Sequence, residues 1–305
     1  MLPITLRQIQ VFESVARHLS HSRAASELYL SQPAISMQIK QVEETCGLTL
    51  LESANKKLFL TEAGREMLHY SRSILQQIKD LEAALDEMKG LERGQLSIAV
   101  VSTANYFMAQ LLAEFIQTHP GIQVSLHVAN RDSVLLQLTD NLANFAIMGL
   151  PTGNSEMDAH PFMENPLVII ASPTHPLATR SHISPAELAR ETFVLRERGS
   201  GTRRVIERYF DQHNLPMPRS MEMDSNEAIK QCVQAGIGLG IISRHAIELK
   251  LETARLHVLD VEGFPIIRDW YIVHRKNKRL SLAAQAFKQF LMTKVAELTS
   301  LAKIS

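Results

Sequence analysis

Residues 32–44 combine an apolar stripe with side chains that can hydrogen-bond to nucleic-acid bases. Ile35 and Ile39 are four residues apart, so one face of a helix over this range would pack inward. Amide and hydroxyl groups can bond base edges, Met and Pro can contact thymine methyl groups, and a lysine can reach phosphate or guanine. The residues predicted to face outward are Gln32, Pro33, Ser36, Met37 and Lys40.

Further groups able to hold phosphate flank this helix. Ala24 and Ala25 would let a preceding helix cross it closely, as in a helix-turn-helix. Serine hydroxyls, basic side chains and helix N-termini bind phosphate oxygens. The candidates are Ser22, Arg23, Ser31 and, at the tip of a predicted β-ribbon, Lys56 and Lys57. Spacing alone leaves a second interpretation open, namely a small helical bundle with a polar outer face.

Two loops farther along the chain have the composition of a small-anion site. Each follows a predicted strand and begins a predicted helix, where free N–H groups and the positive end of the helix dipole favour an anion. Plain helix capping explains either loop alone equally well. Arg196 or Arg203 could supply a charge partner, and the spacing does not decide between them. The loop candidates are Ser102, Thr103, Ala104 and Asn105, and then Ser200, Gly201 and Thr202 after Gly199.

Signatures of catalysis, metal binding and cofactor binding are missing from the sequence. Residues 236–240 are glycine-rich but precede a predicted strand, so they do not match the dinucleotide fingerprint. The sequence contains no phosphate loop, no His-Glu-x-x-His and no Gly-x-Ser-x-Gly motif. Cys46 and Cys232 have no Cys or His at metal-ligand spacing. We therefore expect no enzyme, no metal and no cofactor.

Composition favours a globular chain without membrane segments. The 305 residues carry 32 basic and 32 acidic side chains, and 45% are hydrophobic. No apolar run reaches membrane length and no signal peptide is evident, so we expect a soluble cytoplasmic protein. Residues 1–62 contain 6 basic and 6 acidic side chains, so this N-terminal segment is itself neutral and not basic. Any binding to DNA must therefore depend on a few well-placed side chains and not on net charge.

Helical periodicity and turn residues predict the elements that would position the first set of side chains. We expect helices over 5–19, 22–28 and 32–44, followed by a β-ribbon within 50–61. A long helix should then run from residue 61 to about 91. Apolar residues in it follow a heptad pattern that favours pairing with a second helix, although packing on its own chain is the alternative. The members of this seam are Met67, Ser71, Ile74, Ile78, Leu81, Leu85 and Met88.

After residue 94, short apolar strands alternate with helical stretches. Such alternation predicts α/β units on mostly parallel sheets, and two packed lobes fit the length better than one sheet. The expected strands are 96–101, 122–128, 145–148, 167–171, 193–196, 220–223, 239–242, 255–259 and 268–274. The expected helices are 105–118, 133–142, 202–213, 225–235, 244–250 and one from about 281.

Beyond spacing, particular residue types recur in a fixed order through the first 65 residues. They are Leu6-Arg7-Gln8, Phe12, Val15-Ala16, Ala24-Ala25-Ser26-Glu27-Leu28, Ser31-Gln32-Pro33-Ala34-Ile35-Ser36, Ile39-Lys40-Gln41-Val42-Glu43 and Leu60-Thr61-Glu62-Ala63-Gly64. This set resembles the N-terminal signature of LysR-type transcriptional regulators. One departure is Leu50-Leu51-Glu52-Ser53, where the family usually has Leu-Phe-Glu-Arg, so Lys56 and Lys57 would replace a phosphate-contacting arginine.

The resemblance implies three parts. Residues 1–62 would form a winged helix-turn-helix, residues 63–93 a linker and dimerisation helix, and residues 94–305 an α/β effector domain similar to periplasmic binding proteins. We expect lobe I over 94–163 and 267–305, and lobe II over 164–266. The family also implies a homotetramer on double-stranded operator DNA of two-fold symmetry. By analogy, Gly149, Pro151 and Asn226 would join the effector cleft.

A narrower resemblance concerns regulators of Rubisco and Calvin-cycle operons. It rests on Val11-Phe12, Ala16-Arg17-His18-Leu19-Ser20, Met37-Gln38-Ile39-Lys40-Gln41, Ala146-Ile147-Met148-Gly149 and Glu197-Arg198-Gly199-Ser200-Gly201-Thr202-Arg203. This likeness implies a small anionic effector such as a phosphorylated sugar. The alternatives are a solute-binding module without transcriptional output and an enzyme on a binding-protein scaffold.

Overall fold

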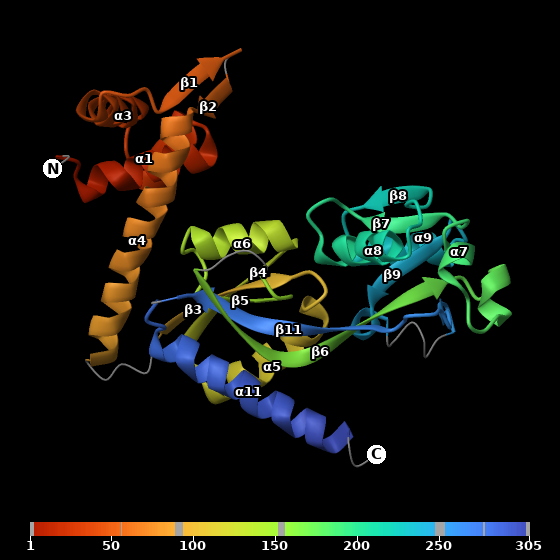
Figure 1. The fold of residues 1–305 in the computed structure, drawn as a ribbon. Helices are drawn as coiled ribbons and strands as arrows, with labels where there is room; N and C mark the ends of the chain where they lie inside the picture. The colour runs from red at the N-terminus through yellow and green to blue at the C-terminus, as the bar shows by residue number, and fades with distance from the viewer. Residues whose placement is uncertain are drawn as a thin grey trace. The chain divides into compact units, whose positions relative to one another are not determined.

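The computed structural model describes residues 3–55, 57–88, 94–151, 156–247, 254–276 and 278–302 (Figure 1). Contacts divide the chain into two units. The first contains Met1–Leu91 with Thr139–Leu142, and the second contains Glu92–Leu138 with Ala143–Ser305.

The N-terminal unit begins with three short helices and a two-stranded ribbon. These are α1 (Leu6–His18), α2 (His21–Leu28), α3 (Gln32–Cys46), β1 (Leu51–Ala54) and β2 (Lys57–Leu60). Thr5 and Ser31 cap α1 and α3 as their positions suggest. Helix α2 begins one residue before the predicted range: its cap is Ser20, which accepts the Arg23 N–H, so Ser22 lies inside the first turn. Serine caps the helix at the residue where the backbone is still extended, and that residue is Ser20.

One small hydrophobic core holds these elements together. Phe12 and Ile35 are fully buried, and Ala24 has no exposed surface where α2 packs closely on its neighbours. Gly64 marks a second close approach, because a Cβ there would lie 2.0 Å from the Leu50 carbonyl oxygen. The glycine therefore lets the following helix begin directly against the ribbon.

The long helix α4 (Glu62–Met88) packs on this core through its first turns, where Ala63, Met67 and Leu68 contact the core. Met67 contacts the core and Ser71 is buried, so these two seam positions are used within the chain. Farther along, Ile74, Leu81 and Leu85 are 39%, 54% and 48% exposed. The first part of the helix therefore contacts its own chain. Of the later seam residues, Ile78 is half-buried and the other three remain exposed. The side chain of Met88 lies outside the described residues.

The second unit is built on a nine-stranded mixed sheet with the order β4-β3-β5-β11-β6-β9-β7-β8, and β10 pairs with β6. Its strands are β3 (Gly94–Val101), β4 (Ile122–Ala129), β5 (Phe145–Met148), β6 (Met157–Ala171), β7 (Phe193–Arg196), β8 (Ser220–Met223), β9 (Leu239–Ser243), β10 (His257–Val258) and β11 (Ile266–Arg275). Its helices are α5 (Asn105–Thr118), α6 (Arg131–Thr139), α7 (Pro185–Leu188), α8 (Gly201–Gln212), α9 (Asn226–Gln234) and α11 (Leu282–Ala302), with 3₁₀ turns η1 (Pro176–Thr179) and η2 (Arg244–Ala246).

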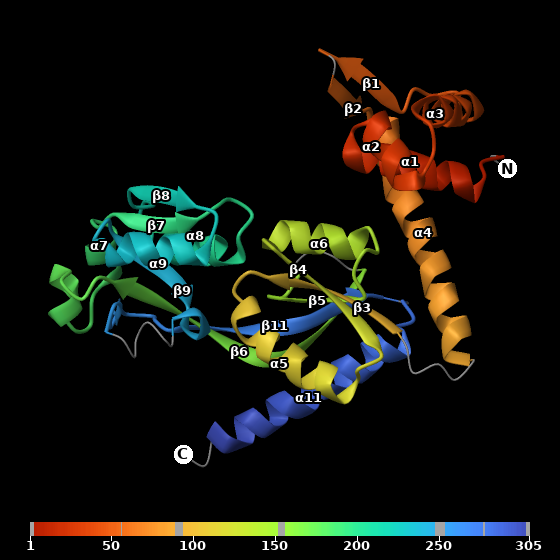
Figure 2. The same cartoon turned by 180° about the vertical axis from the view of Figure 1, so that it is seen from behind.

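Two long antiparallel strands, β6 and β11, run through both halves of this unit (Figures 1 and 2). In one half, α5 and α11 cover one face of β3, β4 and β5, and α6 covers the other (Figure 2). In the other half, α8 and α9 pack against the sheet formed by β7, β8 and β9. The two halves are the two lobes, but they share one continuous sheet, which corrects the expectation of separate, mostly parallel sheets.

Two other element predictions need correction. Only 167–171 was predicted for the strand that extends over Met157–Ala171, because Pro161 and Pro166 interrupt the pattern. The helix predicted over 244–250 is a 3₁₀ turn at Arg244–Ala246, and residues 248–250 lie outside the description.

Candidate functional site

The outer face of α3 presents the side chains predicted to meet DNA. Ile35 and Ile39 are buried, and this turns Gln32, Met37 and Lys40 outward. The Gln32 amide donates to the Ser36 hydroxyl at 3.3 Å, so these two groups form a small polar surface. The Lys40 amine lies 3.7 Å from Glu44 with a 78% exposed side chain and is therefore free to reach another anion.

Other predicted contact groups surround that face. Ser22, Arg23 and Lys57 are exposed, Ser31 and Pro33 form the exposed first turn of α3, and Lys56 lies outside the described residues. Sequence reasoning missed Tyr29, which is 95% exposed at the turn between α2 and α3. Its φ of 54° ends α2, and an aromatic residue at a turn was the available signal.

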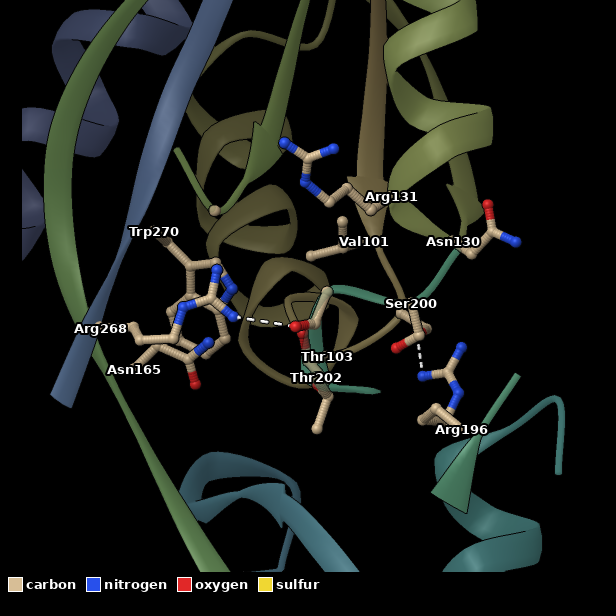
Figure 3. A pocket seen from close by; sticks show the side chains of 13 residues that line it. Val101, Thr103, Asn130, Arg131, Asn165, Arg196, Ser200, Thr202, Arg268 and Trp270 are labelled. Atoms are coloured by element: carbon tan, nitrogen blue, oxygen red, sulfur yellow. Dashed lines mark hydrogen bonds between the residues drawn. The ribbon is translucent and has the colours of Figure 1, made fainter. Parts of the chain in front are cut away.

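A small cavity lies between the lobes of the second unit, and we call it the interlobe cavity (Figure 3). Its volume is about 30 Å³, which is room for ordered water. Of the predicted residues, Ser102, Thr103, Gly149, Arg196, Ser200, Gly201 and Thr202 line it. The two predicted loops thus meet at one place. Residues not predicted also line it, namely Val101, Asn130, Arg131, Asn165, Arg268 and Trp270.

Five predicted residues lie outside the lining of this cavity: Ala104, Asn105, Pro151, Arg203 and Asn226. Arg203 was one of two candidate charge partners, but its guanidinium contacts Glu207 at 2.8 Å and Glu222 at 2.9 Å. Asn226 contacts the cavity residue Arg196, because its Oδ1 accepts a hydrogen bond from the Arg196 guanidinium at 3.0 Å. Ala104 provides the N-cap position of α5 without a side-chain hydrogen bond.

Arg196 joins the two loops, yet its charge is already balanced. Glu197 accepts two of its hydrogen bonds, at 2.7 and 2.9 Å. A third goes across the lobes to the Ser102 hydroxyl at 2.7 Å (Figure 3). With Asn226, this arrangement satisfies most of the guanidinium donors. Arg196 is therefore better suited to hold the lobes together than to attract an anion.

Arg268 is the guanidinium at this cavity that lacks a carboxylate. Among the residues the structure describes, no Asp or Glu lies within ion-pair distance of it, and its hydrogen bond goes to the Gly201 carbonyl at 3.2 Å. A Cβ at residue 149 would lie 2.5 Å from its Nη2, so Gly149 makes room for the guanidinium. Burial, and then the positive charges of Arg131 and Arg208, lower the pKa of Arg268. An anion would relieve this unfavourable environment.

Arg131 and the start of α8 add to the positive character of the cavity. Burial and the nearby Arg204 lower the pKa of Arg131, whose closest carboxylate is Asp132 at 3.7 Å. Gly201 and Thr202 form the first turn of α8, where N–H groups and the helix dipole favour negative charge. The lining of the cavity is thus positively charged, with a helix N-terminus beside two guanidinium groups.

Contacts between lobes explain the small volume. Arg204 of α8 donates to both carboxylate oxygens of Asp132 on α6, at 2.9 and 3.1 Å. The Lys230 amine of α9 lies 4.8 Å from the centre of the Tyr106 ring on α5. These contacts and the Arg196–Ser102 bond join the two lobes beside the cavity.

Two family models match the chain. Residues 6–65 match the bacterial regulatory helix-turn-helix protein of the lysR family, and residues 89–296 match the LysR substrate binding domain. The chain belongs to the LysR family. This LysR-type protein is a DNA-binding transcriptional regulator and not an enzyme. Its winged head, long helix and two-lobed α/β domain confirm the predicted fold class.

Relatives refine this assignment. The chain is 52% identical over 295 residues to the RuBisCO operon transcriptional regulator of Allochromatium vinosum, covering 97% of this chain and 98% of the relative. It is 45% identical to the regulator CbbR of Rhodospirillum rubrum, covering 95% and 96%. The narrower resemblance to Rubisco-operon regulators is therefore confirmed.

Solved structures agree with both parts of the molecule. The regulatory domain of Synechocystis CcmR in complex with 2-PG is 39% identical with a TM-score of 0.64, covering 67% of this chain and 98% of that one. Full-length CbnR complexed with its target DNA shares 21% identity and a TM-score of 0.68, covering 95% and 99%. At that identity, CbnR supports the fold alone.

The described part of the chain contains neither a membrane-spanning helix nor a cluster of metal-binding side chains. None of its helices combines the length and apolar character that a membrane span requires. Within the same ranges, no three His, Cys, Asp or Glu side chains gather as a metal site would need.

Proposed function

We propose that this LysR-type regulator controls carbon-fixation genes of the Rubisco operon in response to a small phosphorylated anion bound in the interlobe cavity. The 52% identity to a RuBisCO operon transcriptional regulator over nearly the whole chain carries the first half of the proposal. The guanidinium of Arg268, which has no carboxylate among the described residues, carries the second. Because its partner is chromosomal DNA, the proposal includes a cytoplasmic location.

In this proposal, α3 enters the major groove and the ribbon contacts the flanking backbone. Gln32, Ser36 and Met37 would contact base edges, while Lys40 and Lys57 would meet phosphates. Supporting groups are Ser22, Arg23, Ser31, Pro33 and Lys56. A head with 6 basic and 6 acidic residues in 1–62 should bind weakly alone.

We infer that two heads are joined through residues 63–93 on a two-fold operator. The exposed apolar side chains of Ile74, Leu81 and Leu85 support this pairing, because exposed Leu and Ile at heptad spacing are stabilised by a second helix. Two such dimers would form the homotetramer. Four linked heads raise the effective concentration of each head at the operator.

For the effector, the charges at the cavity favour a ligand with at least one strong acid group. The CcmR regulatory domain, 39% identical, was solved with 2-PG, so phosphorylated acids are the first ligands to test. Hydrogen bonds between the lobes lie beside this cavity, so we expect binding of a ligand of that size to shift the lobes toward a different arrangement. Such a shift requires different affinities of the ligand for the two arrangements.

Ser36→Ala and Lys40→Ala are each expected to weaken operator binding about five- to tenfold, the cost of one base or phosphate contact. Lys40→Ala should also reduce the slope of log affinity against log salt by about 1 if Lys40 meets a phosphate. Titration of labelled promoter fragments at several salt concentrations measures both effects. The control Lys276→Ala removes an exposed charge outside the head. Binding of the parent protein without sequence preference would contradict operator recognition.

Fluorescence of the intact protein is expected to report effector binding directly. Trp270 is the single tryptophan of the sequence and lines the interlobe cavity. Saturation with 2-phosphoglycolate should change its emission and raise the unfolding temperature, because a ligand at 100 times its Kd stabilises a protein by about 2.7 kcal/mol. Glycolate, which lacks the phosphate, is the control. If a panel of phosphorylated metabolites changes neither quantity, the proposed effector class is wrong.

A further inference from the structure

Two buried polar groups on β6 and β11 face the interlobe cavity without a partner. Asn165 is 6% exposed and Trp270 is fully buried, and both line the cavity. Among the described residues, neither the Asn165 Oδ1 nor the Trp270 Nε1 has a hydrogen-bond partner. A buried polar atom without a partner is energetically unfavourable, because its bonds to water are lost and not replaced. Two such atoms at one cavity indicate a ligand group that they are built to meet.

Sheet register brings both groups to the same end of the cavity as Arg268. Asn165 pairs with Arg268 across the two antiparallel strands, and Trp270 stands two residues along β11 on the same face. Diagonal neighbours of this kind are within reach of long side chains. Figure 3 shows Arg268, Asn165 and Trp270 together on one side, with Arg196 and Ser200 on the opposite side.

The two unpartnered atoms have opposite hydrogen-bonding character. An indole N–H can only donate, and the Oδ1 of an asparagine can only accept. A carboxylate or a fully ionised phosphate accepts and cannot donate, so it satisfies Trp270 alone. A hydroxyl group does both, because its oxygen accepts from the indole while its hydrogen is donated to the amide oxygen. Arg268 beside them provides the charge for an acid group on the same ligand.

We propose that Asn165 and Trp270 form a hydroxyl-binding subsite beside the Arg268 anion site, so that the effector carries a hydroxyl group next to its acid group. Its chemical class is then a sugar phosphate or a phosphorylated hydroxy acid. This inference rests on the proposed effector function of the cavity, and it goes further by assigning a part of the ligand that charge alone does not identify.

A matched pair of ligands tests the subsite in the unmodified full-length protein. The probes are 3-phosphoglycerate and 3-(phosphonooxy)propanoate, which differ by one hydroxyl group. Calorimetric titration should give at least about tenfold tighter binding of the hydroxylated ligand, since a site built to bond a hydroxyl penalises the analogue without it. Equal affinity of the two ligands would overturn the subsite and leave the anion site standing. Failure of both, and of 2-phosphoglycolate, would overturn the effector class together with the subsite.

Variants assign the discrimination to the two residues. Trp270→Phe keeps an aromatic ring without the N–H, and Asn165→Leu keeps the size without the amide, so each should reduce the preference for the hydroxylated ligand below about threefold. The control Ser243→Ala removes another buried unpartnered polar atom, one that does not line the cavity, and should leave the preference unchanged. A preference that persists in both cavity variants would show that a bridging water or another group recognises the hydroxyl, and the proposal would then be wrong.

Discussion

Replacing Arg268 by glutamine is expected to weaken effector binding about 100-fold while leaving the free protein at least as stable as the parent. A buried charge pair that loses one partner costs about 3 kcal/mol, which corresponds to that factor. In the free protein the balance is different, because Arg268 has no carboxylate partner among the described residues and lies near two other guanidinium groups. Its pKa is lowered mainly by burial, so the charged form is held at a cost that glutamine removes.

Thermal unfolding with and without 2-phosphoglycolate separates the two effects. The variant should lose the ligand-induced increase in unfolding temperature and keep or slightly raise the temperature measured without ligand. The matched control is Arg203→Gln, since Arg203 is paired with Glu207 and Glu222 and contacts the cavity residue Arg196 only at its backbone carbonyl. That variant should keep the ligand response and lose some stability. If Arg268→Gln destabilises the free protein and still responds to ligand, Arg268 has a structural role.

The part played by Arg268 could not be predicted from the sequence, and the reason is physical. Residues 268–274 have the composition of an ordinary strand, and the neighbour of Arg268 is Asn165, far away along the chain. Only the register between β6 and β11 brings the two together. Arg196 was predicted, but its spacing gives no sign that the adjacent Glu197 folds back to accept two of its hydrogen bonds.

Local signals were sufficient for the head and for the ends of many elements. Helical period and caps depend on residues within one or two turns, so α1 and α3 follow the prediction within two residues at each end. The long strand β6 shows where such signals fail. Prolines usually exclude a central strand, but β9 pairs with β6 only over Leu167–Ile170. Pro161 and Pro166 therefore lie outside that pairing, where no hydrogen bond to β9 is lost.

The positions of the lobe-joining contacts suggest how ligand binding changes the molecule. Arg196 and Arg204 come from lobe II, and their acceptors Ser102 and Asp132 belong to the first lobe. Both contacts are close to the loops that would hold an anion. A ligand larger than the present cavity can occupy those loops only if at least one contact lengthens or breaks. The ligand therefore competes with the Arg196–Ser102 and Arg204–Asp132 contacts. Its binding free energy is thereby coupled to the arrangement of the lobes.

A charge placed in the exposed seam of α4 is expected to have the largest effect on operator binding. Leu81 and Leu85 are 54% and 48% exposed, although the same helix buries Ser71 closer to the head. Glutamate at both positions would put four charges into a symmetric pairing of two helices, and like charges at such a seam oppose association. We expect the Leu81→Glu/Leu85→Glu variant to remain folded, because these side chains are not part of its own core.

Loss of pairing should reduce operator affinity at least about 100-fold, since linking two binding modules raises affinity by a factor of about 10² to 10⁴. Light scattering after gel filtration measures the change in mass, and a fragment titration at the same protein concentration measures affinity. The control Lys79→Gln changes the charge of the same helix by the same sign at an exposed position off the seam and should leave both unchanged. A head with equal numbers of basic and acidic residues has little non-specific attraction to DNA, so it depends on this linkage. Full operator affinity in a monomeric variant would contradict that dependence.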